Sequence, residues 1–167
     1  MMPEKADQML SSYKMCLGRY QYLMALLPEL REEAARWKVN LASDLAGVNA
    51  QNMDGMPHGT AVSNPTERLG IMLADGYTPE GLKELNRQIE QYEKELNEKS
   101  VVVHFVEAWL SGLTDKERWI IEAQVIDGAY WREVMAEYRK RYGEEYSREG
   151  LKKIRDAAMA KIHQMAM

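Results

Sequence analysis

Two stretches of this chain repeat apolar residues at alternating intervals of four and three, and this spacing limits the possible folds more than any other feature. The spacing places each set on one narrow stripe of an α-helix, where a single neighbouring helix can bury it. Each stretch is therefore predicted to be a long helix with most of its surface exposed. The first set is Met9, Tyr13, Cys16, Tyr20, Leu23, Leu27 and Leu30, and the second is Leu82, Leu85, Ile89, Tyr92 and Leu96.

The neighbour of each stripe is either the other stripe or a second copy of the chain. An antiparallel helical hairpin within one chain is the simpler solution, and a coiled-coil homodimer is the alternative. The segment between the two stripes is long enough for both arrangements. The sequence therefore leaves open whether a second copy of the chain is a partner.

Proline and glycine predict where these helices begin and end. Pro28 should break or kink the first helix near Leu27, because the residue before a proline resists the helical conformation. Residues 47–64 contain glycine, proline and small polar residues without a period, which predicts a loop. Capping signals then predict a short helix over 64–76 and the start of the second long helix at Thr78–Pro79.

The composition supports an all-α fold and a cytoplasmic protein. Strong helix formers dominate, with 12 Met beside 1 Phe and 5 Pro, and no stretch sustains the period-two pattern of strands. The single Cys cannot form an internal disulfide, and the first residues lack an apolar signal segment. No apolar run approaches the length of a transmembrane helix, so no membrane partner is expected.

Nothing in the sequence indicates an enzyme, a metal site or a cofactor. His58, His104 and His163 lie far apart and belong to no metal-binding pattern. Cys16 falls on the first stripe, where a small core residue is the ordinary interpretation, and His58 is interpreted as part of a structural loop. Phosphate-binding, dinucleotide-binding and serine-hydrolase motifs are absent from the sequence.

Three short helices are predicted in residues 113–167, a domain separate from the helical region of residues 1–112. The first opens with the capping box Thr114-Asp115-Lys116-Glu117 and ends at Asp127-Gly128. The second covers about Tyr130 to Tyr138 and is broken by Arg139–Gly143, and the third is capped by Ser147. Their apolar residues should form one core, with Trp109, Trp119 and Trp131 in it rather than stacking on bases. That core joins Leu151, Ile154 and Ile162 to Ile121, Val125 and Val134.

Charge is distributed unevenly along the chain. Residues 1–131 carry 13 Lys and Arg against 20 Asp and Glu, whereas residues 132–167 carry 9 against 6, a net charge of +3. A basic segment in an acidic chain is typical of a polyanion-binding element, although a solvated helix face gives the same pattern. On the third helix, the charged residues away from the apolar stripe are Arg148, Glu149, Lys152, Lys153 and Arg155.

The segment from Leu113 to Ile162 resembles region 4 of sigma-70-type transcription initiation factors, which has a helix-turn-helix fold. The resemblance lies in the pair Glu117-Arg118, the isoleucine pair, Asp127-Gly128 and Trp131-Arg132-Glu133-Val134, followed by the pattern from Ser147 to Ile162. With the helical region and the Gly55–Thr60 loop before it, the chain is similar to late-gene regulators of phages and prophages, of the ArpU/RinA type. The resemblance implies a transcription regulator that binds double-stranded DNA and contacts RNA polymerase.

In such a regulator the third helix enters the major groove with its first residues against the base edges. Arg148 would then donate to guanine, Glu149 would accept from cytosine, and Lys152 would reach a base or a phosphate. The phosphate backbone would be contacted by Lys153, Arg155, Arg139 and Arg141. Two alternatives stay open: a small terminase-like adaptor for DNA packaging, and a helical module that binds only proteins.

Overall fold

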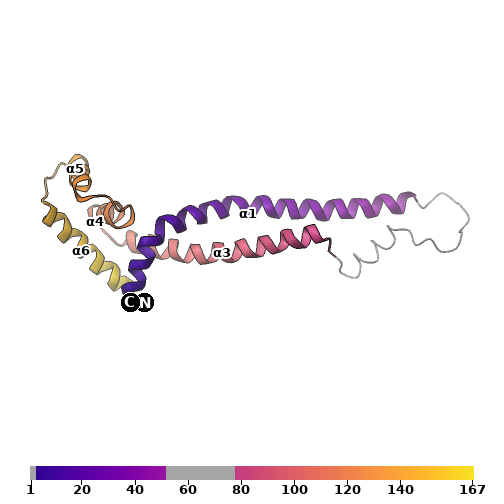
Figure 1. Ribbon diagram of the computed structural model, residues 1–167, viewed down its shortest axis with the longest axis horizontal. Coiled ribbons are helices and arrows are strands. Elements are labelled where there is room, and N and C mark those ends of the chain that lie inside the picture. Colours follow the sequence, from indigo (N-terminus) through magenta and orange to yellow (C-terminus); the bar gives the residue numbers. More distant parts are fainter. Residues whose placement is uncertain (1–2, 52–77) are drawn as a thin grey trace, which may run out of the picture. The chain divides into compact units, whose positions relative to one another are not determined.

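The computed structural model describes residues 3–51 and 78–167, and every regular element in these two ranges is helical (Figure 1). This confirms the all-α fold. None of the described helices is long and apolar enough to cross a membrane. The Gly55–Thr60 loop and the helix expected over 64–76 lie outside the described residues. The elements are α1 (Pro3–Gln51), α3 (Glu80–Ser111), α4 (Asp115–Ile120), the π-helix η1 (Ile121–Ile126), α5 (Trp131–Tyr142) and α6 (Arg148–Met165).

The break expected near Leu27 and the loop expected from residue 47 are wrong for α1, whereas the alternative of a kink at Pro28 stays a prediction. The helix continues through Pro28, and it includes residues 47–51, which were expected to form a loop. Proline removes only one backbone hydrogen bond from a helix, and Leu23 and Leu27 are buried in the turn before it. Packing on this side of the helix therefore offsets the local preference for a break.

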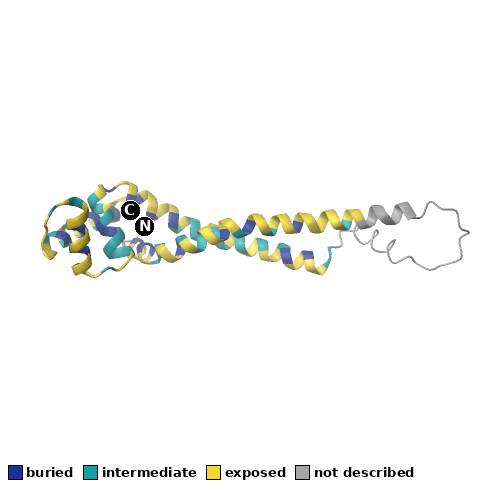
Figure 2. Cartoon of the chain, turned by 90° about the horizontal axis from the view of Figure 1, so that it is seen from above, coloured by how far each residue is buried: buried dark blue, intermediate teal, exposed yellow. Residues whose placement is uncertain are grey.

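The chain divides into two compact units: unit 1, made of Met1–Tyr22 and Glu95–Met167, and unit 2, made of Leu23–Lys94. In each unit a segment of α1 packs against a segment of α3, as the two stripes predict, and buried positions alternate with exposed ones along both helices (Figure 2). In unit 2 one cluster of buried residues consists of Ala34, Leu82 and Leu85, bordered by Leu30, Leu41 and Ile89, and Leu23 and Leu27 are buried as well. The predicted boundary near residue 112, which would make 113–167 an independent domain, stays a prediction.

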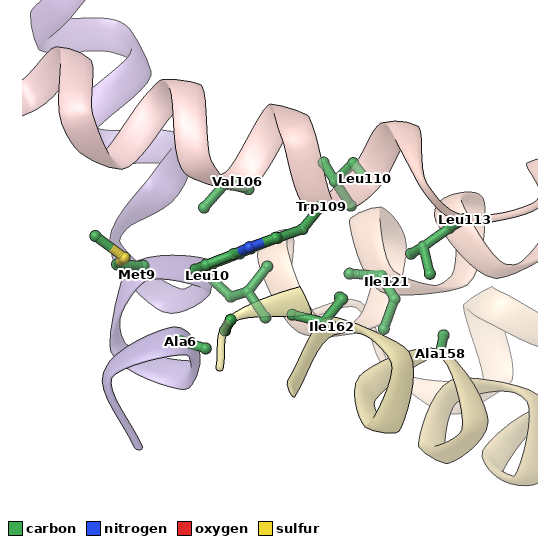
Figure 3. Packing of buried hydrophobic residues seen from close by; sticks show 11 residues of the cluster. Ala6, Met9, Leu10, Val106, Trp109, Leu110, Leu113, Ile121, Ala158 and Ile162 are labelled. Atoms are coloured by element: carbon green, nitrogen blue, oxygen red, sulfur yellow. The ribbon is translucent and has the colours of Figure 1, made fainter. Parts of the chain in front are cut away.

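Unit 1 has two hydrophobic clusters, and the first joins both ends of the chain. Figure 3 shows Leu10 of α1, Trp109 of α3 and Ile162 of α6 pointing toward one another. Ile162 and Leu10 have no exposed surface. This cluster therefore fixes α6 against α1 and α3. Its buried members are Ala6, Met9, Leu10, Val106, Trp109, Leu110, Leu113, Ile121, Ala158, Ile162 and Ala166.

The second cluster lies between α4, α5 and the start of α6. Its buried members are Ile120, Val134, Tyr138 and Leu151, and Trp119, Trp131 and Ile154 pack at its border. The expected single core is thus divided, since Ile121 and Ile162 belong to the first cluster and Leu151 and Val134 to the second. All three tryptophans nevertheless pack on these clusters, which confirms their predicted role in the core.

Among the short helices, α5 ends later than the sequence predicts. α4 begins with the complete capping box of Thr114 and Glu117, as expected. α5 does not break at Arg139 but continues to Tyr142, and Gly143 ends it in the left-handed conformation, at φ 67°. Basic residues in the last turn suit the negative end of the helix dipole, which favours this extension. Only residues 143–146 separate α5 from Ser147, the N-cap of α6.

Candidate nucleic-acid interface

α6 has one buried face and one exposed face, and its first turn is fixed by a cap. The backbone N–H of Gly150 donates to the Ser147 hydroxyl oxygen at 3.1 Å, so Ser147 is the predicted N-cap. Leu151, Ala158 and Ile162 are buried. The helix is therefore rigidly held, and the charged residues of its first turns lie at the surface.

Arg148 and Lys153 are the two exposed cations of α6 without an internal partner. Within the described part of the chain, neither side chain makes a hydrogen bond, an ion pair or a contact with an aromatic ring. An unpaired cation at a surface attracts anions without first losing an intramolecular contact. These two residues are therefore the most available for an anionic ligand.

Glu149 and Lys152 form a pair along the same helix. The Lys152 ammonium donates to a carboxylate oxygen of Glu149 at 3.1 Å. Such a pair at a spacing of three residues is weak at an exposed site, so either side chain can exchange its partner for a base or a phosphate.

Arg155 has a different environment from the one that the sequence predicts. Its guanidinium donates to Asp156 at 2.6 Å, approaches Gln124 of η1 at 3.4 Å, and lies 5.4 Å from the centre of the Trp131 ring. These contacts join α6 to η1 and α5. The structure thus gives Arg155 a role in packing, and a contact with DNA phosphate would compete with it.

Arg139 and Arg141 lie in the last turn of α5, close in sequence to the start of α6. Arg139 pairs with Glu145 at 2.9 Å, and the Arg141 guanidinium lies 5.8 Å from the centre of the Tyr142 ring. Both side chains are exposed. The carboxylate of Glu145 therefore neutralises Arg139 but not Arg141.

Sequence reasoning did not single out two further cations, Lys116 of α4 and Arg132 of α5. Lys116 of α4 donates to both carboxylate oxygens of Glu144 at 2.7 and 2.8 Å, and this hydrogen bond raises the pKa of Lys116. Arg132, in the first turn of α5, is exposed and makes no hydrogen bond or ion pair with any described residue. Only the excess of positive charge after residue 131 could have pointed to Arg132, whereas the pairing of Lys116 with Glu144 has no signal in the sequence.

An aromatic cluster supports the turn between α5 and α6. The Tyr138 ring centre lies 4.7 Å from that of Tyr142 and 5.5 Å from that of Tyr146, and Trp119 lies beside both Tyr138 and Tyr142. The Tyr138 hydroxyl is buried without a hydrogen-bond partner among the described residues, and this burial raises the pKa of Tyr138. These rings fix the position of α6 relative to α5.

The remaining histidines and the cysteine of the described residues lie apart from these cations. They contain no group of three His, Cys, Asp or Glu side chains that could hold a metal ion. His104 contacts Tyr20, His163 pairs with Asp7 at 2.8 Å, and Cys16 is buried on the stripe of α1. Comparisons with protein families, with curated proteins and with solved structures find no match to this chain.

Proposed function

We propose that this protein is a sequence-specific DNA-binding transcription regulator of phage or prophage genes, with α6 as the helix that enters the major groove. One observation carries the proposal: one face of α6 is held in two hydrophobic clusters, while its other face exposes Arg148 and Lys153, which have no partner among the described residues. A helix-turn-helix reads DNA with the first residues of its second helix, and these cations lie in the first two turns of α6.

The proposal assigns two kinds of contact to the surface. Arg148 donates two hydrogen bonds to guanine, and Glu149 and Lys152 reach neighbouring base edges after their mutual pair opens. Lys153 and Arg141 contact phosphates, and Arg139 does so once its pair with Glu145 opens. These contacts fix the helix in the groove but carry no sequence information. Arg155 mainly holds α6 against Trp131 and contributes to the phosphate contacts only where its packing allows.

Selection of bound fragments from a phage or host genome provides the first test. Enrichment of one promoter region supports a transcription regulator, and retention of RNA polymerase on that promoter by the bound protein supports contact with the polymerase. Enrichment of a packaging site would instead replace the proposal by the terminase-like adaptor.

Binding titrations on the selected duplex and on a scrambled one test the residues. Arg148→Ala should lose about 1 to 3 kcal/mol on the selected duplex and little on the scrambled one. Lys153→Ala should weaken both and reduce the slope of log affinity against log salt by about one. Lys38→Ala, which removes an exposed cation from unit 2, is the matched control. If the two α6 variants bind both duplexes as the wild type does, the proposal is wrong and a protein-binding module takes its place.

A further inference from the structure

The turn between α5 and α6 carries two adjacent carboxylates, and each pairs with a cation of another element. Glu144 accepts two hydrogen bonds from Lys116 of α4, at 2.7 and 2.8 Å. Glu145 pairs with Arg139 of α5 at 2.9 Å. We call residues 143–146 the acidic turn. It lies directly before the N-cap of the helix that we propose reads DNA.

The acidic turn is held in place from both sides. On its α5 side, Gly143 ends the helix in the left-handed conformation. On its α6 side, the Tyr146 ring packs edge-on against the buried Tyr138 ring at 5.5 Å. The Tyr142 hydroxyl donates to the backbone carbonyl of Asp115 at 3.3 Å, which ties the end of α5 to α4. The two carboxylates are therefore kept beside their cations.

Both ion pairs are exposed, so they are weak and can be exchanged. In the Arg139–Glu145 pair, 68% and 77% of the two side chains are exposed, and in the Lys116–Glu144 pair 43% and 42%. Exposed pairs of this kind contribute little to stability. A DNA phosphate can take the place of each carboxylate, but the binding free energy is reduced by the pair that must open and by the repulsion between carboxylate and phosphate.

Building on the proposed function, we propose that the acidic turn is an autoinhibitory contact that masks two cations from DNA. Glu145 masks Arg139, and Glu144 masks Lys116. The mask weakens phosphate contacts without changing the contacts to bases. A protein with an open mask therefore binds every DNA sequence more tightly and with a steeper dependence on salt, because each released cation displaces about one further counterion.

Glu145→Gln tests the inference, since the amide keeps the shape of the side chain and removes its charge. It should tighten binding to the selected and the scrambled duplex by about 3- to 10-fold and steepen the salt slope by about one. Glu144→Gln should act in the same direction through Lys116. The matched control is Glu133→Gln, an exposed carboxylate of α5 that has no cationic partner among the described residues, and its effect should be clearly smaller.

A second background separates release of Arg139 from a general effect of charge. In Arg139→Ala, the gain from Glu145→Gln should disappear, whereas a general effect would persist. Circular dichroism and the midpoint of unfolding confirm that each variant is folded.

The possible outcomes separate the two proposals. If the wild type binds DNA but Glu145→Gln binds no more tightly, the autoinhibitory contact is wrong and the proposed function stands. The same holds if Glu145→Gln binds more tightly but keeps this gain in the Arg139→Ala background. Binding by Glu145→Gln but not by the wild type supports both proposals. Absence of DNA binding by every variant overturns both.

Discussion

The two units bury the stripes of α1 and α3 in different surroundings. In unit 2, the described core is one narrow seam around Leu82 and Leu85, and charged pairs such as Glu84–Arg87 at 2.9 Å lie at the surface beside it. In unit 1, the same two helices also contact α6, and the cluster around Trp109 is closed on several sides. The same sequence pattern thus gives a two-helix seam in one region and a full core in the other. Stability should be concentrated in unit 1.

The largest expected effect tests this difference directly. Ile162→Ala removes a completely buried side chain from the first cluster and should cost about 2 to 5 kcal/mol. Leu82→Ala in the seam should fall at the lower end of that range, because two helices close a small cavity more easily than a core with several sides. Urea unfolding measures the loss of stability in both variants. Amide hydrogen exchange should become faster in residues 80–94 of Leu82→Ala but not of Ile162→Ala. If both variants lose the same free energy of unfolding and exchange becomes faster throughout the chain in both, the proposed difference between the two units is wrong.

The second prediction concerns acid, and it rests on Glu117, which connects α4 to α6. Burial opposes its ionisation, but hydrogen bonds from Lys161 at 2.7 Å and from Thr114 outweigh this and lower the pKa of Glu117. A lowered pKa stabilises the folded state above the unfolded pKa of about 4.3, and this stabilisation is lost as the pH falls further. Glu117→Gln should therefore cost about 1 to 3 kcal/mol at pH 7, and this cost should shrink as the pH falls through the lowered pKa of Glu117.

Glu84→Gln in unit 2 is the control for this prediction. The hydrogen bond from Arg87 lowers the pKa of Glu84, but the pair lies within one helix at the surface. Chemical unfolding at several pH values should show a strong pH dependence of the difference for Glu117→Gln and little change for Glu84→Gln.

The third prediction compares two exposed glycines of unit 1. Gly143→Ala should cost about 1 kcal/mol, because a side chain is strained at φ 67°. Gly18→Ala should instead add about 0.5 to 1 kcal/mol, since the residue lies within α1 and a Cβ there would meet no atom within 4 Å. Thermal unfolding should show a lower midpoint for Gly143→Ala and a higher one for Gly18→Ala. A higher midpoint for Gly143→Ala would show that the turn adopts another conformation.

The smallest effect is expected for Tyr138→Phe. The tyrosine hydroxyl is buried without a hydrogen-bond partner in residues 3–51 and 78–167, so its removal should leave stability unchanged or raise it by up to about 1 kcal/mol. Tyr138→Leu, which also removes the ring contacts with Tyr142 and Tyr146, should destabilise the protein. A marked loss for Tyr138→Phe in the same unfolding assay would mean that the hydroxyl has a partner.

Periodic burial could be predicted from the sequence, because it depends on residues close together in the chain. Met9, Cys16, Leu23 and Leu27 are buried as the spacing indicates, and the caps at Thr114 and Ser147 are present. Of the expected break or kink at Pro28, the break was wrong because the local preference was weighed without the packing of the turn before it. Ala6 and Leu10 were missed because their burial depends on α6, more than 140 residues further along the chain.

The candidate site was predictable only in part, for the same reason. The exposure of Arg148 and Lys153 follows from the stripe of α6. The partner of each charge cannot be predicted from that stripe. Arg155 contacts Trp131 and Lys116 contacts Glu144, and each contact joins residues more than 20 positions apart in the sequence. Charge counts therefore indicate a basic region but not which of its cations are neutralised.

The π-helix η1 has a consequence for how one segment serves two clusters. Its Asp127 N–H donates to Glu122 five residues earlier, at 2.9 Å, so this turn holds one residue more than an α-helical turn. Ile120 and Ile121, both without exposed surface, belong to different clusters because adjacent residues of a helix point about 100° apart. The extra residue shifts the helical phase of the residues that follow it, so their side chains point in directions that an uninterrupted α-helix would not give them. Deleting Glu122 or Ala123 would restore the α-helical phase and rotate Gln124 away from Arg155.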